Sequence, residues 1–439
     1  MTMTAESPGR TVVVRRPSGA TVRWVFLALA VVGLITVMPK VISWSDASRM
    51  GTVQAVVDFH TFRIDRTPFH TTGDKVFIGG HYFSDKLTGP ALLGAVVYWP
   101  LSALGLKLGY GWNLAYYLIT LLTVKLSWFL GLVAFFKALR YTPLTEGKRI
   151  WLTLALGLGS LCFTWSATFN NHSLAASWVA IGFFFLLRAR HGERVRLSIF
   201  LAGVFLSLTG GTDLPIMAVY GGFLLYVLAD RTLRRHVGWY LLPVLLTAVP
   251  PLLVNHHISG SFVPVQLVTE YFQYPGTFWK PSMLTGAGMN SGSFLAWYVF
   301  TALIGSRGFL HHSPLLFLAI PFLLRELRPS RPFFREALVT VVVTVPIVAY
   351  YLLYSNNYGG YSYSIRWFVP LLPLLFFFLH PVLDGGRLLR VAFFVLFAAG
   401  VVIATIGLIN PFAYMTYADY PPLANLRTIP GLLRDIRGS

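Results

Sequence analysis

The sequence predicts an all-α polytopic membrane protein. Apolar residues make up 55% of the 439 residues, charged residues make up only 12%, and the mean hydropathy is +0.64. So little polar surface could not keep a chain of this size soluble in water. Backbone amides inside a bilayer must be paired within their own segment, so the membrane-spanning segments are expected to be helices.

Apolar segments recur along the whole chain. Each crossing needs about 20 apolar residues, which predicts about eleven spans, with the N-terminus in the cytoplasm and the C-terminus outside. The expected spans are 22–42, 113–136, 150–168, 173–188, 197–212, 214–229, 237–255, 310–325, 336–355, 366–382 and 391–409. Two further apolar stretches, 90–106 and 294–304, are expected to be interfacial or re-entrant helices, since an extra crossing there would move a basic cluster outside.

Basic residues gather beside the predicted helix ends. The net charge of +19 would suit a nucleic-acid-binding protein, but these clusters alternate with apolar runs, so membrane lipids and not nucleic acid are the expected partners. The positive-inside rule places such clusters in the cytoplasm. They are Arg10, Arg15, Arg16 and Arg23; Lys137, Arg140, Lys148 and Arg149; Arg188, Arg190, Arg194 and Arg196; Arg231, Arg234 and Arg235; Arg325, Arg328, Arg331 and Arg335; and Arg387 and Arg390.

One domain is expected over residues 1–439, with a disordered cytoplasmic tail over residues 1–21 and a long first outer loop over residues 43–112. The first half of this loop is far more polar than a connection between two helices requires. The other predicted outer segments, 170–172, 210–213, 255–293, 306–313 and 356–366, are also polar or rich in glycine. Because these polar and glycine-rich segments are all predicted on the outer side of the membrane, they indicate an extracytoplasmic site.

Several kinds of site find little support. Cys162 is the only cysteine, which rules out an internal disulfide framework. The pairs His256-His257 and His311-His312 do not complete a zinc site, because adjacent side chains point in different directions. No phosphate-binding GxxxxGK[ST] motif and no dinucleotide-binding GxGxxG motif after a strand is present.

Four segments resemble motifs of the GT-C superfamily of membrane glycosyltransferases. SDASRM with HYFSDKLTGPALL is similar to the DExxY and RYFEKPPLGYWL elements of the aminoarabinose transferase and protein-mannosyltransferase group. SRGFLHHSPLLFLAIP resembles the RGLFFxSPxLLLxxP segment, and NNYGGYSYSIRWFVPLLPLL resembles WxGGxSFGPRYLLPLLPxL. Ala47 replaces the family's second acid, and its EKP element reads SDKLTG.

The resemblance implies an enzyme of the plasma (inner) membrane with its active site on the extracytoplasmic side. Its donor would be a polyprenyl-phosphate-linked sugar, and its acceptor a hydroxyl of a glycan, a lipid or a protein. The phosphate leaving group needs no acid, so one carboxylate suffices as general base for an inverting displacement. We assign that role to Asp46, a few residues beyond the first span.

Cations are expected to stabilise the charge that builds on the departing phosphate. Arg366 is the first choice, because a guanidinium binds two phosphate oxygens at once. The further choices, in order, are Lys86, Arg49, Lys75 and Arg307. The expected substrate-binding residues are Tyr82, His172, Asp213, Asp85, Tyr358, Tyr361 and Tyr363. No metal ligand is assigned, although the resemblance leaves open a divalent cation, Mg²⁺ or Mn²⁺, on Asp46 with Asp58 or Asp213.

A membrane transporter or lipid flippase is the main alternative, because it would also have many spans and buried polar residues. Transporters carry ionisable sites at mid-membrane in repeated halves, whereas this chain has one asymmetric outer loop and no detectable repeat. Lys125 is the mid-membrane charge that would suit transport. A ligase or polymerase of preassembled glycans ranks third and a noncatalytic scaffold last.

Overall fold

The computed structural model describes residues 19–412 and 419–437. The first 18 residues of the predicted cytoplasmic tail lie outside the described residues, and its last three begin helix α1, Gly19–Ile35. Helix α1 ends earlier than the expected span 22–42. Pro39 follows shortly after its end, and proline disfavours helical conformation in the residue before it.

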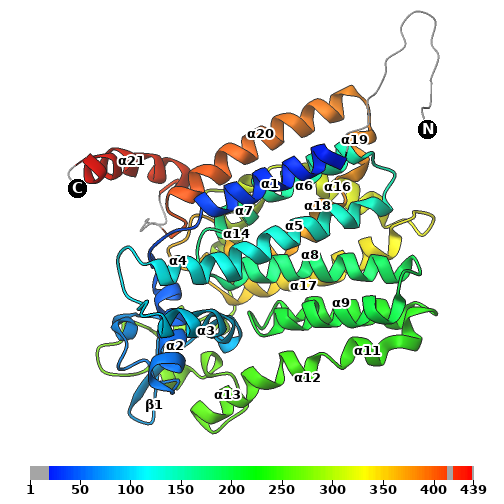
Figure 1. The fold of residues 1–439 in the computed structure, drawn as a ribbon. Helices are drawn as coiled ribbons and strands as arrows, with labels where there is room; N and C mark the ends of the chain where they lie inside the picture. Colours follow the sequence, from blue (N-terminus) through cyan, green and yellow to red (C-terminus); the bar gives the residue numbers. More distant parts are fainter. Residues whose placement is uncertain (1–18, 413–418, 438–439) are drawn as a thin grey trace, which may run out of the picture.

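Long helices lie side by side in a bundle (Figure 1). Within the described residues, six helical segments have the length and composition to cross a membrane: Leu114–Tyr141, Asn171–Arg190, Leu233–Ser259, Phe334–Tyr354, Arg366–Asp384 and Arg387–Ile409. Four shorter apolar helices accompany them: Gly19–Ile35, Val195–Gly210, Met217–Ala229 and Gly292–Leu303. These segments establish a multi-pass membrane protein, while the count of about eleven spans stays a prediction.

Several of the expected spans are broken into shorter helices, and the sequence explains the break in two of them. Span 150–168 is divided between α6 (Glu146–Leu158) and α7 (Leu161–Trp165), because the Ser160 side chain accepts a hydrogen bond from the Cys162 amide and starts a new helix there. Span 310–325 is divided between α15 (Phe309–His312) and α16 (Leu316–Glu326), with Pro314 in the gap.

The other helices of the bundle follow in chain order. They are α4 (Leu114–Thr120) and α5 (Leu126–Ala138), joined by the π-helical turn Leu121–Lys125; α8 (Asn171–Arg190); α9 (Val195–Gly210); α10 (Met217–Ala229); α11 (Val237–Leu241); α12 (Val244–Thr247); α13 (Val249–Ser259); α14 (Gly292–Leu303); α17 (Phe334–Tyr354); the 3₁₀ turn Arg366–Leu371 with α18 (Leu372–Phe377); α19 (His380–Asp384); α20 (Arg387–Ile409); and α21 (Pro421–Arg437).

Ion pairs connect the basic clusters at one end of the bundle. Five of the six predicted clusters, or their immediate neighbours, take part, and the pairs are Arg140 with Glu193, Lys148 with Asp384, Arg190 with Glu336, and Arg335 with Asp230. Helix α8 begins at Asn171 and ends at Arg190, so it separates its two ends by about 28 Å. The basic end and the polar end therefore lie on opposite sides of the bundle, as the charge pattern predicted.

The first loop folds into two helices and a small hairpin at the polar end (Figure 1). Helix α2 is Trp44–Phe59, strands β1 (Lys75–Ile78) and β2 (His81–Ser84) pair antiparallel, and α3 is Thr88–Ala103. Gly79 and Gly80 form the two-residue turn, where both have positive φ. Helices α3 and α14 cover the stretches expected to be interfacial; their depth in a membrane stays a prediction.

The segment between α13 and α14 closes over the hairpin. Val76 and Phe83 of the two strands pack with Val265 and Phe272 in a small apolar cluster of their own. This contact joins the first loop to residues 260–291, which form a cover over the polar end of the bundle.

Candidate active site

A cavity of about 1290 Å³ opens at the polar end. Four of the predicted outer segments line it together with the first loop: the start of α8, the α9–α10 turn, residues 266–285 and residues 356–367. Charged and amide side chains line one part of it, and apolar side chains at the ends of membrane helices line another. The apolar residues include Val41, Ile42, Leu214, Ala218, Pro346 and Ile347.

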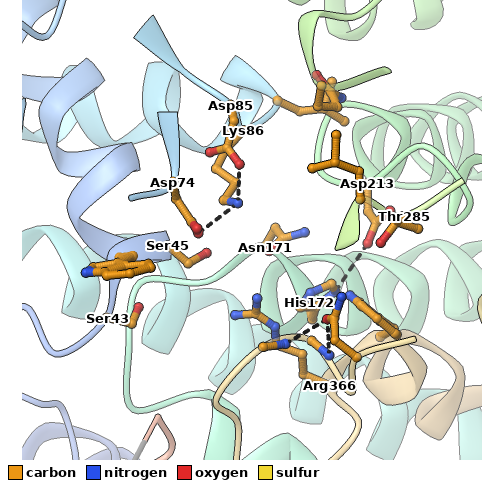
Figure 2. A pocket seen from close by; sticks show the side chains of 18 of the residues that line it. Ser43, Ser45, Asp74, Asp85, Lys86, Asn171, His172, Asp213, Thr285 and Arg366 are labelled. Atoms are coloured by element: carbon orange, nitrogen blue, oxygen red, sulfur yellow. Dashed lines mark hydrogen bonds and ion pairs between the residues drawn. The ribbon is translucent and has the colours of Figure 1, made fainter. Parts of the chain in front are cut away.

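Arg366 lies in the wall of this cavity, at the start of the turn that leads into α18 (Figure 2). Its Nε and Nη1 atoms are buried and have no hydrogen-bond partner among the described residues. Its guanidinium carbon lies 5.0 Å from the centre of the Phe412 ring and 5.9 Å from that of Trp165. The side chain is therefore held by aromatic rings, while donors suited to an oxyanion remain unused.

Arg49 joins the first loop to α8. It donates from Nη1 to the Ser45 hydroxyl at 2.6 Å and from Nη2 to Oδ1 of Asn171 at 2.7 Å. Asn171 in turn donates to the carbonyl of Thr212 at 2.9 Å. Burial lowers the pKa of Arg49 from its ordinary value, against the opposing effect of nearby carboxylates. Arg49 also lines the cavity, but much of its hydrogen-bonding capacity is already used.

Lys86 lies between two carboxylates of the cavity wall. Its Nζ atom is 2.8 Å from Oδ2 of Asp74 and 2.7 Å from Oδ2 of Asp85, as Figure 2 shows. Asp85 also accepts a hydrogen bond from Ser48. Burial raises the pKa of Asp85, while Lys86 lowers it. Because two acids already neutralise Lys86, its attraction for a phosphate is weaker than that of Arg366.

Asp213 lies in the turn between α9 and α10 and also lines the cavity (Figure 2). The Tyr351 hydroxyl lies 2.8 Å from each of its carboxylate oxygens and donates its one proton to the carboxylate. Nδ1 of His172 lies 3.5 Å from Oδ2 of Asp213. Burial raises the pKa of Asp213 to about 6, although the Tyr351 hydrogen bond and nearby cations act against it.

Asp46 lies behind the cavity wall. It is in the first turn of α2, where the Ser43 side chain accepts a hydrogen bond from its amide. Its side chain accepts a hydrogen bond from Tyr116 at 3.1 Å, it is 0% exposed, and it does not line the cavity. Burial raises its pKa to about 7, whereas Arg49, Tyr116 and Arg366 lower it. Asp46, one turn before Arg49 of the cavity wall, and Arg366 both lie at the polar end of the bundle.

The structure brings together only part of the predicted set. Arg366, Lys86, Arg49, His172, Asp213, Asp85 and Tyr361 line the cavity. The remaining six do not: Asp46, Lys75, Arg307, Tyr82, Tyr358 and Tyr363.

Local contacts explain where those residues lie. Lys75 donates to the His70 carbonyl, and its ammonium lies over the Tyr82 ring. Arg307 is buried and donates to the Ser362 carbonyl. Tyr363 donates to the Ile403 carbonyl, and the Tyr358 ring packs on Tyr298. These contacts indicate positioning of the loops and not contact with substrate.

Three cavity residues were missed by the sequence analysis. Tyr351 lies within an apolar helix and Asn171 in a short turn, and no local pattern distinguishes them from helix-packing or capping residues. Asp74 lies in the polar first loop, where the excess of charged residues is the one signal that could have indicated its pairing with Lys86.

The structure separates one of the two acid pairs that the resemblance left open for a divalent cation. Asp46 and Asp58 are twelve residues apart on one helix, about 18 Å along its axis, so one ion cannot bind both. Asp58 instead accepts hydrogen bonds from Tyr98 and Ser102. Within the part of the chain that the structure describes, no group of three His, Cys, Asp or Glu side chains is arranged to hold a metal ion.

The arrangement of helices and cavity defines the chain as a protein of the GT-C fold. No protein-family model matches the sequence. No curated protein matches it either. The fold is similar to that of ArnT, the aminoarabinose transferase from Cupriavidus metallidurans, whose structure was solved bound to undecaprenyl phosphate. The TM-score is 0.59 at 17% sequence identity, and the match covers 93% of this chain and 68% of ArnT.

Two archaeal structures from Archaeoglobus fulgidus are similar as well. The apo oligosaccharyltransferase gives a TM-score of 0.52 at 12% identity, covering 90% of this chain and 56% of its own. AglB in complex with an inhibitory peptide and a dolichol-phosphate gives a TM-score of 0.50 at 13% identity. The match covers 91% of this chain and 57% of AglB. ArnT and AglB are GT-C glycosyltransferases, so the GT-C fold predicted from the sequence motifs is confirmed.

Proposed function

We propose that this protein is a glycosyltransferase that moves a sugar from a polyprenyl-phosphate-linked donor to an acceptor hydroxyl. The observation that carries the proposal is Arg366, which lies in the wall of a cavity that has both a polar and an apolar part. Two of its nitrogen atoms, Nε and Nη1, are buried and have no hydrogen-bond partner among the described residues. A polyprenyl-phosphate sugar has the same two-part chemistry. The solved relatives bound to undecaprenyl phosphate and to dolichol-phosphate support this choice of donor.

In the proposed reaction the acceptor oxygen attacks the anomeric carbon as the bond from that carbon to the phosphate oxygen breaks. The electron pair leaves on the polyprenyl phosphate, where Arg366 stabilises the growing negative charge. Arg49 and Lys86 add positive charge to the same region. A single displacement inverts the anomeric configuration, and an aspartate accepts the proton of the acceptor hydroxyl.

The site is proposed to face the extracytoplasmic side of the plasma (inner) membrane. The basic clusters at the opposite end of the bundle support this orientation by the positive-inside rule. The sugar is a hexose or a pentose, and the acceptor belongs to a glycan, a lipid or a protein. No step is routed through a divalent cation.

Purified protein in lipid nanodiscs tests the proposal. Radiolabelled polyprenyl-phosphate sugars and a membrane extract are supplied, and labelled product and released polyprenyl phosphate are measured. We expect inverted transfer by wild type, and a loss of affinity for polyprenyl phosphate of about 10-fold or more in Arg366→Ala, since a charge-assisted bidentate contact contributes roughly 1.5–3 kcal/mol. Arg328→Ala, an exposed arginine in a cytoplasmic cluster, is the control and is expected to behave as wild type.

A transporter or lipid flippase makes a different prediction. It would move polyprenyl-phosphate lipid between leaflets without breaking the sugar–phosphate bond. The buried ammonium of Lys125 donates to the hydroxyls of Thr36 and Ser166 and does not line the cavity, which gives that alternative less support. Flipping in proteoliposomes without release of polyprenyl phosphate would replace our proposal.

A further inference from the structure

The cavity wall contains three carboxylates, and they differ in their partners. Asp74 and Asp85 share the ammonium of Lys86. Asp213 has no lysine or arginine nitrogen within ion-pairing distance among the described residues. A carboxylate bound to an ammonium is a poor proton acceptor, because its negative charge is already compensated. Asp213 is thus the cavity carboxylate that is best able to receive a proton.

Asp213 also has better access to the cavity than Asp46 has. Its side chain is 12% exposed, whereas Asp46, the base expected from the sequence, is 0% exposed and lies behind the wall. Figure 2 shows Asp213 directed toward His172, to which a dashed line joins it. A hydroxyl that enters the cavity can therefore approach Asp213 directly, while reaching Asp46 requires the wall to open.

Tyr351 fixes the position of the Asp213 carboxylate. It contacts both carboxylate oxygens at 2.8 Å, and its own ring is stacked on Trp367 with ring centres 4.4 Å apart. Each carboxylate oxygen has two lone pairs, so one hydrogen bond from Tyr351 leaves further acceptor capacity toward the cavity. Such a buried, oriented and unneutralised carboxylate matches the geometry that a general base requires.

Resting on the proposed function, we infer that Asp213 is the general base that binds the acceptor hydroxyl and removes its proton, with Tyr351 as its positioning residue. The acceptor O–H proton moves to a carboxylate oxygen of Asp213, and the acceptor oxygen forms a bond to the anomeric carbon. The bond between that carbon and the phosphate oxygen breaks, and its electron pair leaves on the polyprenyl phosphate. The acceptor subsite is thereby placed between the α9–α10 turn and Arg366.

The pH profile gives the first readout. Only ionised Asp213 accepts a proton, so kcat/KM is expected to rise with pH along an acid limb near pH 6, the raised pKa of Asp213. Removing the Tyr351 hydroxyl removes a hydrogen bond that lowers this pKa, so Tyr351→Phe is expected to move the limb to higher pH. The groups that act on Asp213 are His172 of α8, Tyr351 of α17, Arg366, Arg49 of α2 and Lys86.

A nucleophile that carries no proton gives the second readout. Asp213→Asn is expected to slow transfer to a hydroxyl acceptor by about 100-fold or more, with polyprenyl-phosphate affinity unchanged. Azide needs no base, so added azide is expected to restore sugar transfer from the donor in Asp213→Ala, as glycosyl azide and released polyprenyl phosphate. The control is Asp384→Asn, which changes a carboxylate at the cytoplasmic end.

Near-wild-type hydroxyl transfer by Asp213→Asn, with the acid limb retained, would overturn the inference and leave the proposed function intact. Azide that restores transfer in Asp46→Ala but not in Asp213→Ala would also overturn the inference and leave the proposed function intact, since the base would then be Asp46. Absence of transfer by wild type would overturn the proposed function and this inference together. Should Asp213 variants misfold, an unmoved acid limb in Tyr351→Phe would count against the assignment.

Discussion

A methyl group added at Gly359 would lie 2.9 Å from Nε of Arg366. Gly359 also has φ of +95°, a conformation that side chains rarely adopt. The Gly-rich loop therefore approaches the arginine so closely that only glycine fits there. This approach holds the guanidinium against the cavity wall.

Gly359→Ala is expected to weaken polyprenyl-phosphate binding, because the new methyl group displaces Arg366. Gly360→Ala is the matched control, since Gly360 has φ of +78° and open space around its Cβ position. Both variants carry the backbone strain, but only the first carries the clash. Binding measured in nanodiscs should fall about 10-fold more in Gly359→Ala than in Gly360→Ala, which corresponds to about 1.4 kcal/mol. Equal losses would show that the backbone and not Arg366 is responsible.

The Lys86 cluster gives a charge-dependent prediction. Asp74, Asp85 and Lys86 together carry a net charge of −1 when all are ionised, which opposes an incoming phosphate. Asp74→Asn should tighten polyprenyl-phosphate binding about fivefold, roughly 1 kcal/mol for a partly exposed pair. Lys86→Ala should weaken it. Titration at low and high salt checks both changes, and an Asp74→Asn variant that binds less tightly would exclude a phosphate near Lys86.

Burial of Asp46 predicts how stability varies with pH. Its folded-state pKa is raised from 3.8 to about 7, so its contribution to stability is fully present below pH 3.8 and is lost as pH rises through 7. Asp46→Asn removes this pH-dependent loss of unfolding free energy, which amounts to at most about 4 kcal/mol for a pKa shift of about three units. The melting temperature of the variant minus that of wild type should grow from pH 4 to pH 8. A difference that shrinks over this range would contradict the buried position.

The basic end of the bundle, which carries the ion-paired clusters, allows stability and activity to be tested separately. Glu336 is fully buried and accepts hydrogen bonds from Arg190 and from Tyr226. Glu336→Ala leaves Arg190 without its carboxylate and should destabilise the protein by about 3 kcal/mol. Because the cluster lies at the far end of α8 from the cavity, the polyprenyl-phosphate affinity of the folded fraction should not change. Thermal unfolding and binding measured on the same sample test this, and a parallel loss of affinity would argue for coupling between the two ends.

Much of the candidate site was predictable from the sequence. The segments around Arg49, Lys86 and Arg366 were identified from polar residues next to apolar helices, and their motifs resembled those of one fold. In the structure, Arg49, Lys86 and Arg366 line one cavity. Such prediction works because charged side chains are costly at membrane depth, so their positions along a membrane chain are informative.

Other features could not be predicted because they depend on contacts distant in sequence. Tyr351 and Asp213 are separated by 138 positions, and no local pattern pairs them. Asp46 and Arg49 lie on one helix turn, yet Arg49 contacts Asn171 and not Asp46. The direction of each side chain follows from which helices pack together.

The sequence by itself determined the class of the protein, the end of the bundle that carries the basic clusters and the loops that contain the candidate chemistry, because hydropathy and charge act locally along the chain. The tertiary structure alone decided which acids reach the cavity. Helix packing buries Asp46 beside Tyr116, neutralises Asp74 and Asp85 with Lys86, and leaves Asp213 open beside Tyr351. Access and neutralisation are properties of neighbours in space, and the sequence does not specify them position by position.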